Sequence, residues 1–394
     1  MKVICDRAAL LEAVNTVGSV VPTRSPSPAL SCVKLTATKT GSVGALSLAG
    51  TDAEVSIALG LSKVDVVQAG VAVVSADRLR AIIGSIDEKD QTLTIELDGD
   101  VCHIKGTRSR FKLFAFPAAD FPPLPDMQQV TGGPTPPRAV FNVPAGTLLR
   151  LINRTSFATA RETSRYAING VLFKRDGKKL EMVATDGRRL ALCRASLKAA
   201  GEGTGVTSAI IPTKALGLLT RVAHDPEGNV RIAVTDNKAF FAFEDGEGKE
   251  KSPRAVVSTT LVEGAFPPYE DVIPKDQDKK ITSAREDLVR AVRQAEILTN
   301  EESRGVRMSF NNKDKSAKLF SRSPEMGESE IELALSGYEG DNIEISFNPR
   351  FIADALKTVD EPEVLIELKA PNKPGLFKAG NDFVYVVMPV NLPS

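Results

Sequence analysis

The sequence predicts an α+β protein made of three related domains, each with two helices packed on antiparallel sheets. A phrase that reads as a short alternating strand followed by an amphipathic helix recurs along the chain, and its copies start roughly 140 residues apart. These copies begin at Met1, Ala139 and Lys280. A second strand–helix phrase and a strand-rich tail follow in every copy, the phrase at Val71–Ile86, Ser208–Ala223 and Ile343–Val359.

A turn motif recurs inside the repeat. Val183–Cys193 reads VATDGRRLALC, and Ala49–Leu59 reads AGTDAEVSIAL, with the same Thr-Asp pair. Asp186-Gly187 between alternating apolar runs is typical of a type I′ hairpin, whose two central residues both take positive φ angles. Because Asp52 and Asp186 occupy equivalent turns of different copies, we interpret both as turn formers.

Two proline-rich stretches mark the expected domain boundaries. Phe121–Pro137 and Phe266–Lys280 both open with Phe-Pro-Pro. Pro and Gly at the density of the first stretch predict a linker without helix or sheet. We therefore expect domains at residues 1–130, 138–265 and 275–394.

Composition narrows the class of protein only a little. The 50 Lys and Arg residues balance the 50 Asp and Glu residues, so any DNA-facing surface has to be offset by an acidic one. The four cysteines, Cys5, Cys32, Cys102 and Cys193, lie singly, which is not the pattern of a zinc site or a disulfide scaffold. We expect a cytoplasmic protein, because the chain shows neither a signal segment nor an apolar run that spans a bilayer.

Several helices are expected to carry cations on the face opposite their apolar stripe. Within any one helix, such cations indicate no more than a solvated basic face. The same placement in several copies favours one continuous positive lining, which would contact phosphates without reading sequence. The spacings that carry this interpretation are Arg150 with Arg154, Lys214 with Arg221, Arg290 with Arg293, and Arg350 with Lys357.

The sequence contains few residues that could form a catalytic site. Neither histidine, His103 or His224, lies beside a nucleophile motif. The acidic residues Asp52, Glu54, Asp186 and Asp236 have the oxygen ligands that Mg²⁺ prefers, but the repeat favours a turn-forming role for Asp52 and Asp186. We therefore predict a protein that is not an enzyme and has no cofactor or metal site.

Several stretches together resemble the bacterial DNA polymerase III β subunit family, the sliding clamps. They run in order over essentially the whole chain: Ser109–Pro122, Arg161–Phe173, Val183–Cys193, Ala295–Phe310 and Tyr385–Leu392. The resemblance implies that two subunits close head to tail into a ring of six domains, with helices lining the hole and sheets outside. Duplex DNA threads the ring, which tethers the replicative polymerase and confers processivity.

The resemblance also implies site residues. Arg24, Tyr166, Lys214 and Arg221 would face DNA, and helical spacing adds Arg150, Arg350 and Lys357. Ala167 stands where the family has a second aromatic residue, which weakens that contact. The dimer contact would join Phe111 and Leu113 of the first domain to Ile297 and Leu298 of the third. The alternative is that these four are core residues.

A partner-peptide pocket is implied between the second and third domains. It would take a short linear motif of the polymerase α subunit, the clamp loader and repair proteins. Alternation supports an apolar groove, because Val386–Met388 would turn every second side chain outward; the alternative is a buried last strand. Asp271, Arg188 and the Pro393-Ser394 extension depart from the family pattern and affect peptide preference. The pocket residues are Ile168, Thr185, Gly187, Arg189, Leu190, Pro267, Val272, Val386, Val387, Met388, Pro389, Val390 and Leu392.

Two other classes of function remain open from the sequence. One is a scaffold with the same repeat that binds proteins but no DNA, for which neutralising the helix arginines would change nothing. The other is a metal-dependent enzyme on nucleic acid that uses Asp52 and Asp186. Neither explains the apolar C-terminal segment as well as the clamp does.

Overall fold

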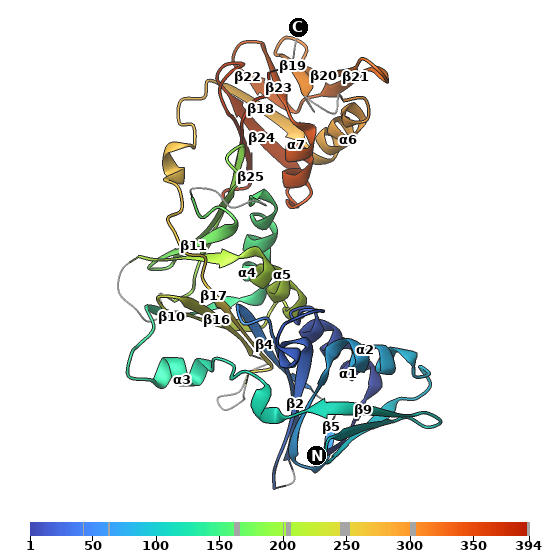
Figure 1. Ribbon diagram of the computed structural model, residues 1–394. Helices are drawn as coiled ribbons and strands as arrows, with labels where there is room; N and C mark the ends of the chain where they lie inside the picture. The colour runs from blue at the N-terminus through green and yellow to red at the C-terminus, as the bar shows by residue number, and fades with distance from the viewer. Residues whose placement is uncertain are drawn as a thin grey trace. The chain divides into compact units, whose positions relative to one another are not determined.

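The computed structural model describes residues 1–41, 43–61, 64–160, 166–199, 201, 206–244, 253–299 and 305–391 (Figure 1). The chain forms two compact units. Unit 1 comprises Met1–Leu149, Lys198–Thr207 and Lys214–Leu261, and unit 2 comprises Arg150–Leu197, Ser208–Thr213 and Val262–Ser394.

One antiparallel sheet runs through unit 1. Within the described residues its strand order is β10-β15-β16-β17-β4-β3-β2-β6-β9-β8-β7-β1-β5. The strands are β1 (Lys2–Asp6), β2 (Cys32–Thr40), β3 (Val43–Thr51), β4 (Val55–Leu61), β5 (Val64–Gln68), β6 (Gly70–Ser75), β7 (Thr92–Asp98), β8 (Val101–Lys105), β9 (Arg110–Phe116), β10 (Ala139–Pro144), β15 (Asn229–Val234), β16 (Lys238–Glu244) and β17 (Ala255–Thr260).

Two further sheets lie in unit 2. Their orders among the described residues are β14-β11-β12-β13-β26-β25-β24-β18-β22 and β21-β20-β19-β23. The strands are β11 (Gly170–Asp176), β12 (Lys179–Thr185), β13 (Arg189–Ser196), β14 (Thr207–Pro212), β18 (Lys279–Ala284), β19 (Val306–Asn311), β20 (Ser316–Ser323), β21 (Gly327–Ala334), β22 (Gly337–Glu339), β23 (Ile343–Phe347), β24 (Glu363–Leu368), β25 (Gly375–Ala379) and β26 (Phe383–Val387).

Every predicted strand–helix phrase is confirmed as a strand that leads directly into a helix. Helix caps end the strands: Asp6 Oδ1 accepts from Ala9 N at 2.8 Å, and Asn348 Oδ1 accepts from Arg350 N at 3.0 Å. The helices of the phrases are α1 (Arg7–Gly18), α2 (Ala76–Ser85), α4 (Ala145–Asn153), α5 (Thr213–Val222), α6 (Arg285–Glu296) and α7 (Pro349–Leu356).

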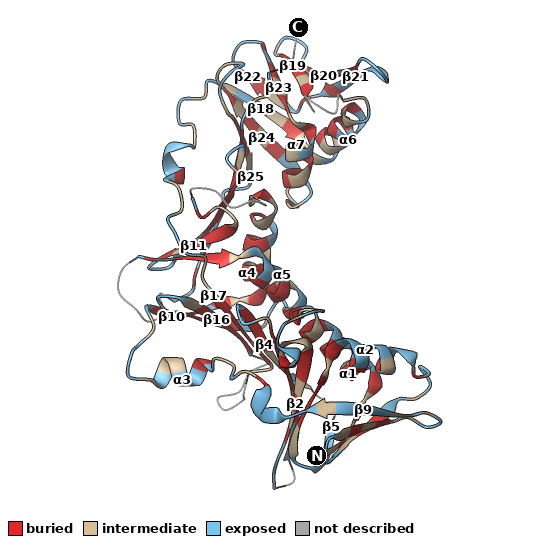
Figure 2. Ribbon diagram, viewed as in Figure 1, coloured by how far each residue is buried: buried red, intermediate tan, exposed pale blue. Residues whose placement is uncertain are grey.

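The helices bury one face against the sheets. In unit 1, α1 packs on α2 and on β3 and β4, with Leu10, Val14 and Val17 fully buried. In unit 2, α6 packs on α7, β20 and β21, and α7 packs on β26. Figure 2 shows the buried side of these helices turned toward the strands. The predicted packing of amphipathic helices on antiparallel sheets is therefore confirmed.

The prediction of a linker without helix in Phe121–Pro137 is wrong. Helix α3 spans Met127–Gly132 inside this stretch, and Asp126 Oδ1 accepts from Gln128 N at 2.9 Å. No proline falls between Pro125 and Gly132, so a short capped helix fits there. Met127 is buried and packs with Val140 and Phe240, which stabilises this helix.

The repeated turns are alike down to their hydrogen bonds. Thr51 Oγ1 donates to Val55 O at 2.9 Å, and Thr185 Oγ1 donates to Arg189 O at 2.7 Å. Asp52 Oδ1 and Asp186 Oδ1 each accept from two following backbone N–H groups. The expectation of a type I′ turn at Asp186-Gly187 is wrong, because only Gly187 has a positive φ, of 84°. The aspartate side chain satisfies the backbone instead.

Ala53 holds the position of Gly187 in the first copy, and its φ is 80°. A residue with a Cβ is strained there by about 1–2 kcal/mol. We expect Ala53→Gly to raise the free energy of unfolding by about 0.5 kcal/mol, since the relieved strain exceeds the added entropy of the unfolded chain.

Gly187→Ala is the matched reverse change, because a Cβ at this position would meet no atom within 4 Å and only φ opposes it. We expect a loss of about 1 kcal/mol. Urea titrations followed by circular dichroism measure both effects, and changes of the same sign in the two variants would contradict the shared turn geometry.

Candidate functional site

Two of the predicted pocket residues, Leu190 and Val386, lie in one apolar cluster of unit 2. This cluster joins the strands on both sides of β13 to the connector after Leu261. Its buried members are Ala167, Leu172, Val183, Leu190, Leu192, Ile210, Tyr269, Leu376 and Val386, and Val262, Phe266, Ile273 and Val384 pack against it. Segments from four places in the sequence therefore share one core.

Strand pairing aligns the centre of the pocket region. In the antiparallel pair β13–β26, Arg189 lies opposite Val387, and Leu190 lies opposite Val386. Just beyond it, Met388 N donates to Arg188 O at 2.9 Å. The Asp186–Arg188 turn and the chain after Val387 are therefore held side by side.

The flanking pocket residues are half-buried or exposed. Ile168, Pro267, Pro389 and Val390 are half-buried, and Ile168 O accepts from Ala160 N at 3.0 Å. Of the residues that depart from the family pattern, Arg188 and Asp271 are exposed. Leu392 and the Pro393-Ser394 extension lie outside the described residues.

The alternation argument for Val386–Met388 is wrong. Tyr385, Val386 and Val387 are exposed by only 0%, 1% and 0%. On one face of β26, Val386 packs into the apolar cluster, and on the other face Tyr385 lies against α7, so both faces are covered. The apolar surface of this region is instead supplied by Met388 and Val272, which are 40% and 47% exposed.

Most of the predicted DNA-facing cations already have a carboxylate partner. Lys214 pairs with Asp52 and also donates to Val20 O at 3.2 Å. The other pairs are Arg150 with Asp382, Arg350 with Glu296 at 2.8 Å, and Lys357 with Asp354 at 3.9 Å. Within the described residues, Arg24 and Arg221 are exposed and have no ion-pair partner. Tyr166 is 43% exposed.

Arg154 is not on a solvated face, contrary to the sequence prediction. Its side chain is 4% exposed and pairs with Glu361 at 2.9 Å and with Asp382 at 3.1 Å. Burial opposes the charge on Glu361, but backbone hydrogen bonds and Arg154 outweigh this and hold its pKa below the usual value. The end of α4 is thereby tied to the loops beside α7 and β26.

The predicted dimer residues divide into exposed and half-buried side chains. Ile297 is 71% exposed at the C-terminal end of α6, and Leu298, Phe111 and Leu113 are half-buried. Sequence reasoning missed Phe114, which is 78% exposed on β9. The alternation of β9 contained the signal, because Phe114 and Phe116 share the face opposite Phe111 and Leu113.

The groups considered for catalysis have structural roles. Asp52 and Asp186 cap their turns and pair with Lys214 and Arg189 respectively. All four cysteines are buried and free, and burial raises the pKa of the Cys32 thiol to about 11, which disfavours a thiolate nucleophile. The described part of the chain contains no group of three or more His, Cys, Asp or Glu residues that could hold a metal ion.

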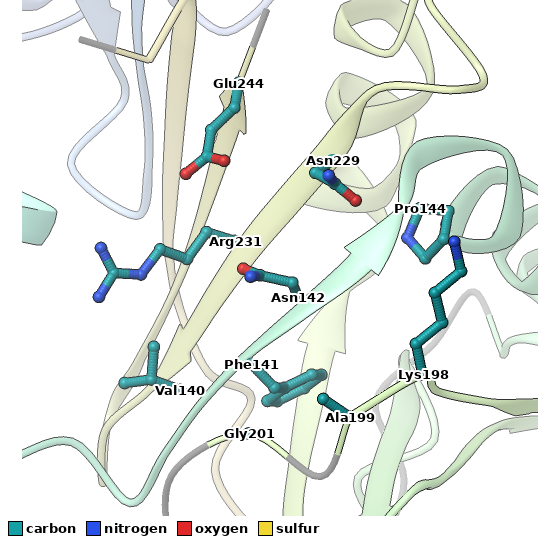
Figure 3. Close-up of a pocket in the computed structure, with 10 residues that line it drawn as sticks. All are labelled: Val140, Phe141, Asn142, Pro144, Lys198, Ala199, Gly201, Asn229, Arg231 and Glu244. Atoms are coloured by element: carbon teal, nitrogen blue, oxygen red, sulfur yellow. The ribbon is translucent and has the colours of Figure 1, made fainter. Parts of the chain in front are cut away.

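A cavity of about 490 Å³ lies in unit 1 beside β10, β15 and β16 (Figure 3). Its charged lining residues are Lys198, Arg231 and Glu244. In Figure 3 the Lys198 and Arg231 side chains lie on opposite sides of the lining, and the Arg231 guanidinium points away from Lys198. Because these groups do not converge on a common point, we assign no ligand to this cavity.

Comparison with known proteins accounts for this arrangement. Family models of the DNA polymerase III beta subunit match the N-terminal domain at residues 1–125, the central domain at 142–268 and the C-terminal domain at 270–391. The chain belongs to the DNA polymerase III beta subunit family, the beta sliding clamps.

Similar sliding clamps cover the chain from end to end. The beta sliding clamp of Pseudomonas putida is 34% identical over 389 residues, which are 98% of this chain and 99% of that protein. The Escherichia coli K12 clamp is 31% identical over 394 residues, all of both chains. The Pseudomonas aeruginosa clamp bound to griselimycin superposes with a TM-score of 0.87 at 32% identity, covering 100% of both chains.

The family decides among the functions that the sequence left open. The chain is a sliding clamp for DNA polymerase processivity, and it is not an enzyme. This excludes the metal-dependent enzyme and the scaffold without DNA. None of the helices in the described ranges is long and apolar enough to cross a membrane.

Ion pairing within this sliding clamp predicts which of its cations contribute to the salt dependence of DNA binding. Arg24→Gln and Arg221→Gln should each reduce the slope of log K against log salt by about 0.9, because each would remove one counterion-releasing contact. Arg150→Gln should reduce it by less than about half of that, because phosphate would displace Asp382 rather than a salt ion.

Fluorescence anisotropy of a labelled duplex over a salt series measures these slopes, with Arg80→Gln as the control, since Arg80 pairs with Asp77 on α2 and is not among the predicted contacts. Equal slopes in all variants would contradict a role for Arg24 and Arg221.

Proposed function

We propose that two copies of this chain close head to tail into a ring, through the free edge of β9 in one copy and the free edge of β21 in the other. The observation that carries this proposal is the pair of open strand edges. In the described residues, Arg110–Leu113 pair only with β8, and β21 pairs only with β20. An open edge presents unpaired backbone groups that another chain satisfies.

Charge supports the pairing of these two edges. The exposed side chains along β9 include Arg110 and Lys112, and those along β21 include Glu328, Glu330 and Glu332. Lys318 on the neighbouring strand binds Glu330 at 2.9 Å and Glu332 at 3.2 Å, which leaves part of the acidic charge for a partner. Opposite charges across a strand pair stabilise it.

Apolar contact would add to the charge. Phe114 extends from β9, and Ile297 follows α6, the helix that packs on β21. A contact that joins two different surfaces closes only when its rotation suits a ring, and two copies of three similar domains meet this condition. Phe111 and Leu113, on the face of β9 opposite Phe114, and Leu298, next to Ile297, would border this contact.

Within this ring, duplex DNA would be held by topology and by weak phosphate contacts. Arg24 and Arg221 supply free charge, and Tyr166, Arg150, Lys214, Arg350 and Lys357 would supply secondary contacts. A clamp held in this way slides while it tethers the polymerase.

The partners would dock on the apolar surface around Met388 and Val272. We assign the replicative polymerase α subunit, the clamp loader and other proteins with the clamp-binding motif to this pocket. The exposed thioether of Met388 adapts to different apolar side chains, which suits a surface with several partners. Free, buried cysteines support a reducing location, so we place the clamp in the cytoplasm.

The dimer proposal is tested by placing a charge at each side of the contact. Phe114→Asp and Ile297→Asp should each weaken dimerisation by about tenfold or more, because each would bury an unpaired carboxylate. Val43→Asp is the matched control, since Val43 is 70% exposed on β3 and lies outside both edges.

Sedimentation velocity over a concentration series gives the dimer dissociation constants. The proposal expects monomers for the two interface variants at concentrations where Val43→Asp and the unaltered protein are dimers. Dimers of equal strength in all four proteins would contradict it.

A further inference from the structure

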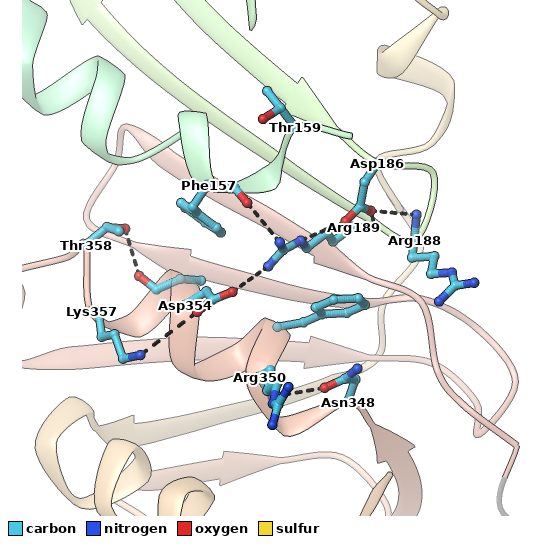
Figure 4. Close-up of polar contacts among 12 residues, drawn as sticks. Phe157, Thr159, Asp186, Arg188, Arg189, Asn348, Arg350, Asp354, Lys357 and Thr358 are labelled. Carbon is cyan, nitrogen blue, oxygen red and sulfur yellow. Dashed lines mark hydrogen bonds and ion pairs between the residues drawn. The ribbon is translucent and has the colours of Figure 1, made fainter. Parts of the chain in front are cut away.

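The Arg189 side chain is the most thoroughly engaged charge near the proposed pocket. It is 10% exposed. Arg189 Nε donates to Asp186 Oδ2 at 3.0 Å, Nη1 to Asp354 Oδ2 at 2.9 Å, and Nη2 to Phe157 O at 2.8 Å (Figure 4). Its planar fork therefore joins the β12–β13 turn, helix α7 and the 3₁₀ turn Ser156–Ala158.

Aromatic rings cover the guanidinium as well. Its Cζ atom lies 5.4 Å from the ring centre of Phe157 and 4.5 Å from that of Phe351. Cation–π contacts at these distances stabilise the charge, and they occupy the surface that a ligand would otherwise stack on. Arg189 is therefore committed to its own protein on several sides.

Hydrogen bonds connect the partners of Arg189 to residues of the proposed pocket. Asp186 Oδ1 accepts from the backbone N–H groups of Arg188 and Arg189 at 3.0 Å, which shapes the turn. The carbonyl of Arg188 in that turn accepts from Met388 N. Met388 and Gly187 thus depend on the carboxylate that Arg189 orients.

Helix α7 is connected to the same region by a second route. Tyr385 is fully buried on β26, and its hydroxyl donates to Phe351 O at 2.9 Å. Phe351 and Asp354 both lie on α7. Arg189 and Tyr385 therefore hold one side of α7 against β13 and β26. Val387 is the last residue of β26, and Met388 follows it.

We propose that Arg189 is a positioning residue of the partner-peptide pocket, which sets the geometry of the Asp186–Arg188 turn and Met388 from α7 and does not itself read the peptide. This inference rests on the proposed function of the pocket. It replaces the sequence-based expectation that Arg189 is one of the residues that contact the peptide.

The geometry makes the two roles distinguishable. A residue that contacts an acidic peptide through its charge would keep much of its effect as Lys. A residue that acts through a planar fork with three directed N–H donors would not, because an ammonium cannot reproduce that geometry. A positioning role also requires Asp354, which lies on α7 and is not a pocket residue.

The test measures binding of a fluorescein-labelled synthetic peptide that carries the clamp-binding motif of the host's replicative polymerase, by anisotropy, with the full-length dimer. We expect Arg189→Lys, Arg189→Met and Asp354→Ala each to weaken peptide binding about tenfold. Asp354→Asn should keep most of the affinity, because its amide oxygen still accepts from Nη1.

Two controls separate this effect from others. Arg307→Met is the matched control, because Arg307 also pairs with a carboxylate, Glu344 at 3.6 Å, and lies 5.9 Å from an aromatic ring centre, that of Phe320, outside the pocket, so its peptide affinity should equal that of the unaltered protein. Combining Arg189→Met with Asp354→Ala should cost no more than Arg189→Met alone, because both changes remove one interaction. The dimer dissociation constant of each variant shows whether the fold outside the pocket is intact.

Three results would overturn the inference. Unaltered peptide affinity in both single variants, Arg189→Lys and Asp354→Ala, would show that the pocket does not need to be positioned by this pair. A loss in Arg189→Met with none in Asp354→Ala would mean that Arg189 contacts the peptide directly. If the unaltered protein does not bind the peptide, or Met388→Asp leaves its binding unchanged, the pocket itself is misassigned and the inference falls with it.

Discussion

Pairing between strands from distant parts of the sequence is the interaction on which the functional region depends. The centre of unit 2 is the antiparallel pair β13–β26, which joins the strand after the Asp186–Arg188 turn to the last strand of the described chain. Without this pair, Leu190 and Val386 would not share a core, and Met388 would not meet Arg188. In unit 1, β4 and β17 pair in the same manner, and a bond between Ser56 and Ser258 of 2.6 Å reinforces them.

Buried arginines reinforce these long-range pairings. Arg154 and Arg189 each connect a segment near the middle of the chain to α7 or to the loops beside it, through carboxylates at 2.9–3.1 Å. A buried guanidinium needs close carboxylate partners to offset its lost hydration, so each of these side chains favours one relative arrangement of the segments it joins. This matters for a pocket that is assembled from several segments, because its shape is only as well defined as their arrangement.

Local patterns in the sequence predicted local structure well. Strand–helix phrases and the Thr-Asp turns depend on residues a few positions apart, and both formed as expected except for the turn type. The failures share a cause. Helix α3, the burial of both faces of β26 and the pairing of Arg154 depend on partners such as Phe240, α7 and Glu361 that lie far away in the sequence. Spacing alone carries no information about these partners.

For the site residues too, the sequence indicated their identity but not the distant partners that surround them. The resemblance to a family and helical spacing indicated which residues to consider. The structure shows their surroundings: a carboxylate beside Lys214, Arg150, Arg350 and Lys357, and a largely buried guanidinium at Arg189. Because this protein has no net charge, the cations that it presents to DNA are matched by carboxylates elsewhere on the chain. Many of these carboxylates lie directly beside the cations. Such pairing limits the strength of phosphate contacts, which is what a sliding protein requires.

Retention on DNA of defined topology tests the ring most directly. The purified protein, loaded by its clamp loader with ATP, would be compared on a nicked circular plasmid and on the same plasmid cut once. A ring held by topology stays on the circle and is lost from the ends of the linear form, even at salt concentrations that abolish phosphate contacts. Equal retention on both forms would show ordinary electrostatic binding and would contradict the ring.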